Sequence, residues 1–107
     1  MKSWRIRVRH FRDHQSETER LADTIRASSD LAATSRSETG CRDYRFGVDV
    51  EDRHRVHLFE ESASEEDLNV HFTTSHFAAF STLLVEVLAE EPTFTRYEAV
   101  SSGPLFG

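Results

Sequence analysis

The sequence has few of the residues that stabilise secreted domains or bind structural metals. Cys41 is the single cysteine among 107 residues, so no intrachain disulfide can form. The cysteine and the histidines also lack the spacing of a zinc finger. These absences are typical of a protein from a reducing compartment, and we expect a cytoplasmic location.

Long apolar runs and positive net charge are lacking as well. In residues 1–11, arginine or histidine separates the apolar residues, which excludes a signal-peptide core. No apolar run in the sequence approaches the ~18 residues of a membrane span. The formal net charge of −6 disfavours nucleic acids and anionic membranes as partners. A small basic cluster, which we expect to pair with acidic helices rather than to bind an anion, consists of Arg5, Arg7, Arg9 and Arg12.

The composition of the chain suits one small globular domain. Hydrophobic residues make up 37% and charged residues 30% of the sequence, a balance unlike that of disordered or membrane proteins. The length allows one hydrophobic core of useful volume. We therefore expect a single domain over residues 1–100 and a C-terminal tail over residues 101–107.

Apolar periodicity predicts a strand and then a helix in the first 40 residues. Residues 4–11 alternate between apolar and basic side chains, which is typical of a half-buried strand. Ser16 and Glu19 have capping-box spacing, so a helix is expected to begin there and to end at Gly40. The apolar stripe of this helix is expected to be Leu21, Ala22, Ile25, Ala32 and Ala33.

A hairpin is predicted next, followed by two helices and a last strand. Residues 41–50 and 55–62 alternate in polarity on either side of a short polar turn. Ser64 begins a short helix, Thr73 to Ser75 interrupt it, and a stronger helical pattern continues to Pro92. The last strand is expected over residues 93–100, and one face of the first hairpin strand should carry Tyr44, Phe46, Val48 and Val50.

The order of these elements predicts an α+β fold of the ferredoxin-like type. Strand, helix, strand, strand, broken helix and strand form the βαββαβ arrangement, in which a four-stranded antiparallel sheet carries its helices on one face. The other face needs a cover, because Phe59 points opposite to Leu58 and Phe11 opposite to Trp4. We therefore expect a homodimer in which two sheets face each other.

Two histidines beside phenylalanines are the candidate chemical groups. His71 and His76 are five residues apart, and on one helix they would point ~140° away from each other, unlike a helical metal pair. Local spacing therefore predicts no metal site, although the helix break allows the two rings to meet in the tertiary structure. His71 at a helix end is expected to bind free carbonyl groups, whereas His76 at a helix start is expected to stay neutral and to be the better acid or base.

Several short motifs, in a fixed order along the chain, resemble those of a known family. They are Ser37-Glu-Thr-Gly-Cys41 before the strand with Tyr44, Phe59-Glu60, Ser64 to Leu68, His71, Ser75-His-Phe77 and Arg96-Tyr-Glu98. With these motifs the sequence resembles the antibiotic biosynthesis monooxygenase family from about residue 4 to residue 100.

This resemblance implies a dimeric α+β barrel with a pocket between sheet and helices in each subunit. The family includes oxygenases that oxidise phenols or quinols with O2 and without metal or flavin, heme-degrading enzymes, and an isomerase of a sugar phosphate. The heme-degrading branch is disfavoured, because its asparagine, tryptophan and histidine correspond here to Arg9, Ser62 and Ser81. We therefore expect no cofactor.

The expected activity is a cofactor-independent monooxygenation of an aromatic phenol, quinol or polyketide-like molecule. Such chemistry needs a base, groups that hold an anion, and a dry aromatic cavity. His76 or His71 is the expected base, and Tyr44 and Arg9 are expected to bind substrate oxygens. Glu60, also expected at the substrate site, is expected to form an ion pair with His71 or Arg45, and a catalytic role is the alternative. The pocket wall is expected to be Phe46, Phe59, Phe72 and Phe77, for which an ordinary core position is the alternative.

Two other functions are compatible with the sequence. One is an isomerase of a small phosphorylated metabolite, with anion contacts from Arg5, Arg7 and Arg9. The other is a non-catalytic dimeric protein that binds an aromatic metabolite. The substrate itself is beyond what the sequence determines.

Overall fold

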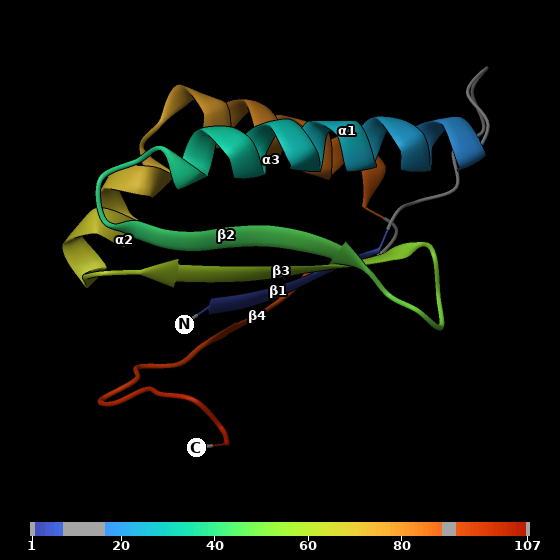
Figure 1. Cartoon of the computed structure of the whole chain (residues 1–107). Coiled ribbons are helices and arrows are strands. Elements are labelled where there is room, and N and C mark those ends of the chain that lie inside the picture. The colour runs from blue at the N-terminus through green and yellow to red at the C-terminus, as the bar shows by residue number, and fades with distance from the viewer. Residues whose placement is uncertain (1, 8–16, 89–91, 107) are drawn as a thin grey trace.

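The structure, a computed structural model, is a four-stranded antiparallel sheet with all three of its described helices on one face (Figure 1). It describes the backbone of residues 2–7, 17–88 and 92–106, and the side chains from residue 18 onward within these ranges. The strands lie in the order β2-β3-β1-β4, so the predicted ferredoxin-like fold is confirmed. The elements are β1 (Lys2–Arg7), α1 (Glu17–Arg36), β2 (Cys41–Val48), β3 (Arg55–Ser62), α2 (Glu65–Phe72), α3 (Ser75–Val87) and β4 (Thr93–Arg96).

The β2–β3 hairpin presents the apolar side of the sheet to the helices. Its cross-strand pairs include Tyr44 with Glu60 and Phe46 with Leu58, so these side chains share one face. The expected fourth member of the face, Val50, is fully exposed beyond the end of β2. That prediction is wrong because the chain turns at Asp49, whose carboxylate accepts hydrogen bonds from the next backbone N–H groups.

Helix α1 buries only part of the predicted apolar stripe: Leu21 and Ala32 are buried as predicted, whereas the other three predicted residues are exposed. Ile25 is 42% exposed, and Ala22 and Ala33 are exposed as well. Small hydroxyl residues are buried in place of these exposed apolar residues. The Thr24 hydroxyl donates to the carbonyl of Arg20 at 2.8 Å, so the buried hydroxyl of Thr24 is not an unpaired donor. The buried face consists of Leu21, Thr24, Ser28, Leu31, Ala32 and Ser35.

The break between α2 and α3 is confirmed, and the start of each of these helices is capped by a hydroxyl group. The Ser64 hydroxyl accepts from the N–H of Asp67 at the start of α2, and the Thr74 hydroxyl accepts from the N–H of Phe77 at the start of α3. Helix α3 ends at Val87, before the predicted stop at Pro92. None of the described helices is long and apolar enough to cross a membrane.

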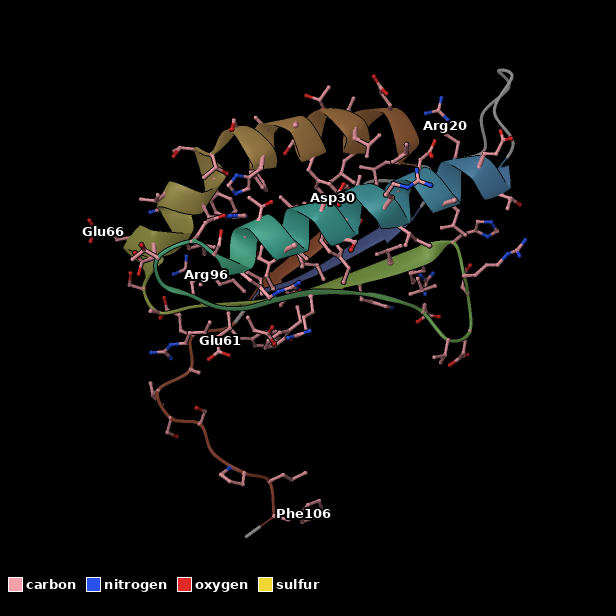
Figure 2. The ribbon with its side chains drawn as sticks, turned by 45° about the horizontal axis from the view of Figure 1, so that its top comes forward. Arg20, Asp30, Glu61, Glu66, Arg96 and Phe106 are labelled. Atoms are coloured by element: carbon pink, nitrogen blue, oxygen red, sulfur yellow. The ribbon has the colours of Figure 1, made fainter. Side chains whose placement is uncertain are left out.

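The last strand is shorter than predicted, and the predicted end of the first strand is not tested. Strand β4 covers Thr93–Arg96 and the chain then leaves the sheet as an extended segment that carries Phe106 far from the domain (Figure 2). The predicted first strand continued to residue 11, but residues 8–11, including Phe11, lie outside the described residues. The side chain of Trp4 is likewise outside them.

The sheet face opposite the helices is more polar than expected. Leu58 is buried under the helices, whereas Phe59 points to the opposite face and is 38% exposed, as predicted. Its described neighbours on that face are polar by strand alternation and register, and Glu61 projects away from the helices in Figure 2. These neighbours are Asp43, Arg45, His57 and Glu61.

Gly40 fixes the turn between α1 and β2. Its φ of 79° lies in the left-handed region, which is costly for residues with a Cβ. A Cβ at this position would also lie only 2.0 Å from the carboxylate of Asp67, which belongs to the N-terminal turn of α2. The turn is therefore packed directly against the start of α2.

We expect Gly40→Ala to lower the free energy of unfolding by more than about 1 kcal/mol, because left-handed backbone costs a residue with a Cβ ~1–2 kcal/mol and the clash with Asp67 adds to it. Urea unfolding followed by circular dichroism measures this change. Gly47→Ala is the matched control, because nothing lies within 4 Å of the added Cβ. Equal stabilities of the two variants would contradict the assigned role of Gly40.

Candidate active site

Both candidate histidines converge on one carboxylate. His71 lies in the last turn of α2, His76 in the first turn of α3, and Glu38 in the turn between α1 and β2. Nδ1 of His71 is 2.9 Å from each oxygen of Glu38, and Nε2 of His76 is 2.5 Å from Oε2. The rings therefore meet through the tertiary structure, which the sequence spacing left open.

The other ring nitrogen of His71 faces the sheet. Nε2 lies 3.3 Å from the Tyr44 hydroxyl and 3.9 Å from Oε1 of Glu60. A single tautomer satisfies both sides: Nδ1–H donates to Glu38, and Nε2 accepts from the Tyr44 hydroxyl. The expected contact of the His71 ring with helix-end carbonyls is wrong, because backbone N–H groups of Thr73 and Thr74 occupy those carbonyls.

These groups form a path from the core to the surface. Tyr44, Glu60 and His71 are at most 3% exposed. The side chain of Glu38 is 16% exposed and that of His76 is 25% exposed. The chain of ionisable groups Glu60, His71, Glu38 and His76 therefore begins in the interior and ends at solvent.

Tyr44 is held as a neutral phenol. Burial raises its pKa far above the ordinary value, and the negative charges of Glu60 and Glu38 raise it further. Burial, followed by the same two carboxylates, also raises the pKa of the Cys41 thiol. Tyr44 is thus a hydrogen-bond donor to His71 at neutral pH, and Cys41 stays a thiol.

Three of the four predicted aromatic wall residues surround this cluster. The rings of Phe72 and Phe77 lie 5.6 Å and 5.0 Å from the ring of His71, centroid to centroid. Phe46 lies 5.9 Å from Tyr44. These rings exclude water from one side of His71, which strengthens its polar contacts.

The other predicted site residues are placed elsewhere. Phe59 lies on the opposite face of the sheet from His71, apart from the other three aromatic rings, but it lines the large cleft beside Glu60. Glu60 has His71 as its neighbour, as predicted, whereas Arg45 pairs with Asp43 at 2.9 Å. Arg9 lies outside the described residues.

A large cleft borders the buried end of the path. Its volume is ≈ 780 Å³, which is within the range of small-molecule sites. It lies where β3 and β4 end, beside the start of α2 and the extended segment after β4. Residues that line it include Glu60, Ser62, Leu68, Arg96 and Tyr97.

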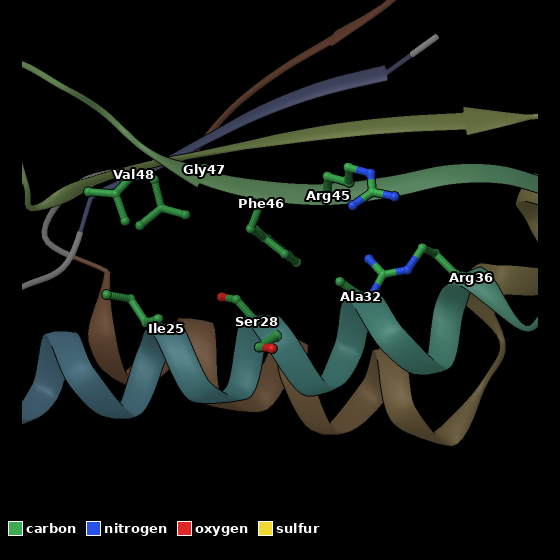
Figure 3. Close-up of a pocket in the computed structure, with 10 residues that line it drawn as sticks. Ile25, Ser28, Ala32, Arg36, Arg45, Phe46, Gly47 and Val48 are labelled. Carbon is green, nitrogen blue, oxygen red and sulfur yellow. The ribbon is translucent and has the colours of Figure 1, made fainter.

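A smaller cavity of ≈ 230 Å³ lies between α1 and β2. Figure 3 shows Arg36 and Arg45 at one end and Ile25 and Val48 at the other. Phe46 is the one predicted site residue in its wall. No member of the path lines this cavity, whereas Glu60 lines the large cleft, and His76 lines a third cavity of ≈ 250 Å³ between α1 and α3. Because Glu60 is the buried end of the path, the cleft beside it is the better candidate for chemistry.

Glu38 is the residue that sequence reasoning missed. It stood inside the motif that resembled the family, but no periodicity or spacing linked a turn residue to histidines 33 and 38 positions later. Its oxygens and the two imidazole nitrogens lie within 4.8 Å of one another. The three residues therefore have the donor types and proximity of a metal-binding group.

The fold agrees with the comparison to known proteins. The family model for antibiotic biosynthesis monooxygenase matches residues 7–83. The chain therefore belongs to the antibiotic biosynthesis monooxygenase family. Among curated proteins, no significant match is found.

Solved structures of low sequence identity share the fold. One described as an antibiotic biosynthesis monooxygenase has 20% identity and a TM-score of 0.79, with 94% of this chain and 97% of that chain covered. PA3566 of Pseudomonas aeruginosa has 22% identity and a TM-score of 0.78, with 94% of this chain and 92% of that chain covered. A Bacteroides thetaiotaomicron protein of unknown function, described as a possible oxidoreductase, has 24% identity and a TM-score of 0.73. The match covers 90% of this chain and 94% of that chain.

We expect Tyr44→Phe to lower the free energy of unfolding by about 1–3 kcal/mol, because Nε2 of His71 then loses its hydroxyl partner in a water-excluding site. Tyr97→Phe is the matched control, because Tyr97 is 53% exposed, and its change should stay within about 0.5 kcal/mol. Urea unfolding measures both. If Tyr44→Phe is as stable as the control, the contact between Tyr44 and His71 does not stabilise the protein.

Proposed function

We propose that this protein is a cofactor-independent monooxygenase that oxidises an aromatic phenol or quinol with O2. The observation that carries the proposal is the path of ionisable side chains from Glu60, in the wall of the large cleft, through His71 and Glu38 to His76. Membership of the antibiotic biosynthesis monooxygenase family supports the same reaction class.

The substrate would bind in the cleft with its hydroxyl group at Glu60. Glu60 is the buried carboxylate of the lining, and Leu68 and Tyr97 provide apolar and aromatic surface beside it. The proton of the substrate hydroxyl passes to Glu60, whose Oε1 is 3.9 Å from Nε2 of His71. His71, Glu38 and His76 then pass a proton towards solvent.

Deprotonation is what makes the substrate reactive towards oxygen. The phenolate donates electrons to O2 through a ring carbon that carries hydrogen, and a carbon–oxygen bond forms to give a peroxide at that carbon. Loss of the ring hydrogen as a proton breaks the O–O bond and releases water. In total, HO–Ar–H and O2 give the quinone O=Ar=O and H2O, so the phenol supplies the four electrons and the side chains only move protons.

The surroundings of His71 suit this role. The Tyr44 phenol stays protonated because its pKa is raised by burial and by nearby carboxylates, so it fixes the His71 ring without competing as a base. Phe72 and Phe77 keep the same ring away from bulk water. A positioned base in a dry site is what this reaction requires.

The charged groups of the cleft favour a neutral aromatic substrate over a phosphorylated one. Arg96 donates to Glu65 and to Glu98, both at 3.1 Å, and Arg42 lies 3.8 Å from Glu61. Both arginines are therefore already matched by carboxylates and offer little attraction to a phosphate group.

Oxygen consumption tests the proposal. With a panel of hydroxynaphthalenes and quinols, we expect enzyme-dependent O2 uptake, with one atom of 18O2 in the quinone and the other in water. Glu60→Gln and His76→Ala should lower the rate by about 100-fold or more, because a positioned base contributes ~10²–10⁴-fold.

His57→Ala is the control for loss of a histidine. His57 pairs with Asp49 at 2.9 Å on the other face of the sheet, so its replacement should leave the rate unchanged. No uptake with any compound of the panel, or equal rates for wild type and His76→Ala, would contradict the proposal.

We further propose that the protein is a homodimer joined through the sheet face that the helices leave open. The chain segment beyond β4 extends away from its own domain (Figure 1), and apolar residues near its end are exposed. Leu105 and Phe106 are 88% and 87% exposed, and Phe59 lies exposed on the same open face. A second copy of the chain is the partner that the family resemblance implies for this surface.

Sedimentation velocity tests the dimer. We expect twice the mass of one chain for the wild type and a shift towards the monomer for Phe59→Lys, because a buried unpaired charge opposes association. Val85→Lys, on α3 and 73% exposed, should leave the mass unchanged. A monomeric wild type would exclude this arrangement.

A further inference from the structure

We propose that Glu38, His71 and His76 form a binding site for one divalent transition-metal ion. The site consists of two imidazole nitrogens and one carboxylate, and these donor atoms lie within 4.8 Å of one another. They come from three places in the chain: the turn after α1, the end of α2 and the start of α3. The five-residue spacing of the histidines excluded a metal pair on one helix. The site forms instead because the tertiary structure brings the three segments together.

The spacing of the donor atoms is close to what a bound ion needs. Ligand nitrogens and oxygens lie ~2.0–2.2 Å from Zn²⁺, which puts tetrahedral ligand atoms about 3.3 Å apart. The carboxylate of Glu38 already lies 2.9 Å from Nδ1 of His71 and 2.5 Å from Nε2 of His76. A shift of the Glu38 side chain on the order of 1 Å would admit the ion, and Glu38 sits on a turn at the partly exposed end of the cluster.

His71 is oriented as metal-binding histidines are. Such a histidine usually directs its second ring nitrogen to a carboxylate or another polar group, which fixes the ring and makes the ligand more basic. Here Nδ1 points to the site, and Nε2 faces the Tyr44 hydroxyl and the Glu60 carboxylate. A bound ion would replace the hydrogen on Nδ1, and the ring would then carry its hydrogen on Nε2, where it could donate to Tyr44 or Glu60. The outer groups that a metal site needs are therefore in place.

The charge of the cluster also favours a cation. Glu38 supplies a carboxylate to the site, a second carboxylate, that of Glu60, lies 3.9 Å from Nε2 of His71, and carboxylate groups attract a divalent ion. The guanidinium of Arg36 is directed elsewhere, to the carbonyl of Tyr44 at 2.7 Å. Two histidines with one carboxylate suit zinc, iron(II) or cobalt(II), whereas magnesium and calcium prefer sites made of oxygen atoms.

A bound ion would block the path that the proposed oxygenase uses. Nδ1 of His71 and Nε2 of His76 would be ligands, so neither nitrogen could exchange a proton. This consequence rests on the proposed function, whereas binding of the ion does not. The protein would then be active without metal and inhibited by it.

The test is a titration of the full, tag-free chain with Co²⁺ and with Zn²⁺ after removal of metals with a chelator. We expect one ion per chain by calorimetry. The visible absorption of bound Co²⁺ should report nitrogen and oxygen ligands without a thiolate, since Cys41 is not one of the three donors. Thermal unfolding should shift to higher temperature with added Zn²⁺.

Three variants locate the site. Glu38→Gln and His76→Gln should each weaken binding at least tenfold, because each removes one of three ligands. Both side chains are partly exposed, and circular dichroism checks that each variant is folded. His57→Gln is the matched control, since His57 also contacts a carboxylate, that of Asp49, but lies outside the cluster.

Each outcome decides the question. Loss of the ion in both cluster variants and its retention in His57→Gln support the site. No binding by the wild type, or equal binding by all variants, overturns it. Because the titration contains no substrate, failure of the oxygen assay leaves the metal result standing, and Zn²⁺ binding without inhibition of an active enzyme would refute only the blocking role.

Discussion

The structure of the candidate site depends on a single carboxylate shared by two imidazoles. Glu38 contacts both His71 and His76, and it thereby ties the turn after α1 to the junction of α2 and α3. A carboxylate in this half-buried position is stabilised because both neighbours can donate hydrogen bonds to it. The same contact orients His71 so that its other nitrogen meets Tyr44.

This constraint explains features that lie far apart in the fold. Gly40 has a left-handed backbone and leaves room for Asp67, which brings the turn with Glu38 close to the start of α2. The cap at Thr74 begins a new helix where the two rings must approach. The proton path and the metal site that we propose use the same atoms, because a group of donors that shares protons can also bind a cation.

The sheet provides the other half of the site. Tyr44 and Glu60 are cross-strand neighbours on the face that the helices cover, and both are buried against His71. One carboxylate of the path is thus held by rigid strands and the other by a turn. The strand side stays dry, whereas the turn side reaches solvent at His76.

The sequence by itself determined the element order, the hairpin, the helix break and the alternation that separates Leu58 from Phe59, because periodicity and caps act over a few residues. It also marked both histidines and Tyr44. Only the tertiary structure decided that Glu38 joins them and that hydroxyl residues of α1 are buried. These outcomes depend on which distant segments pack together, and contacts between residues more than 30 positions apart leave no local pattern.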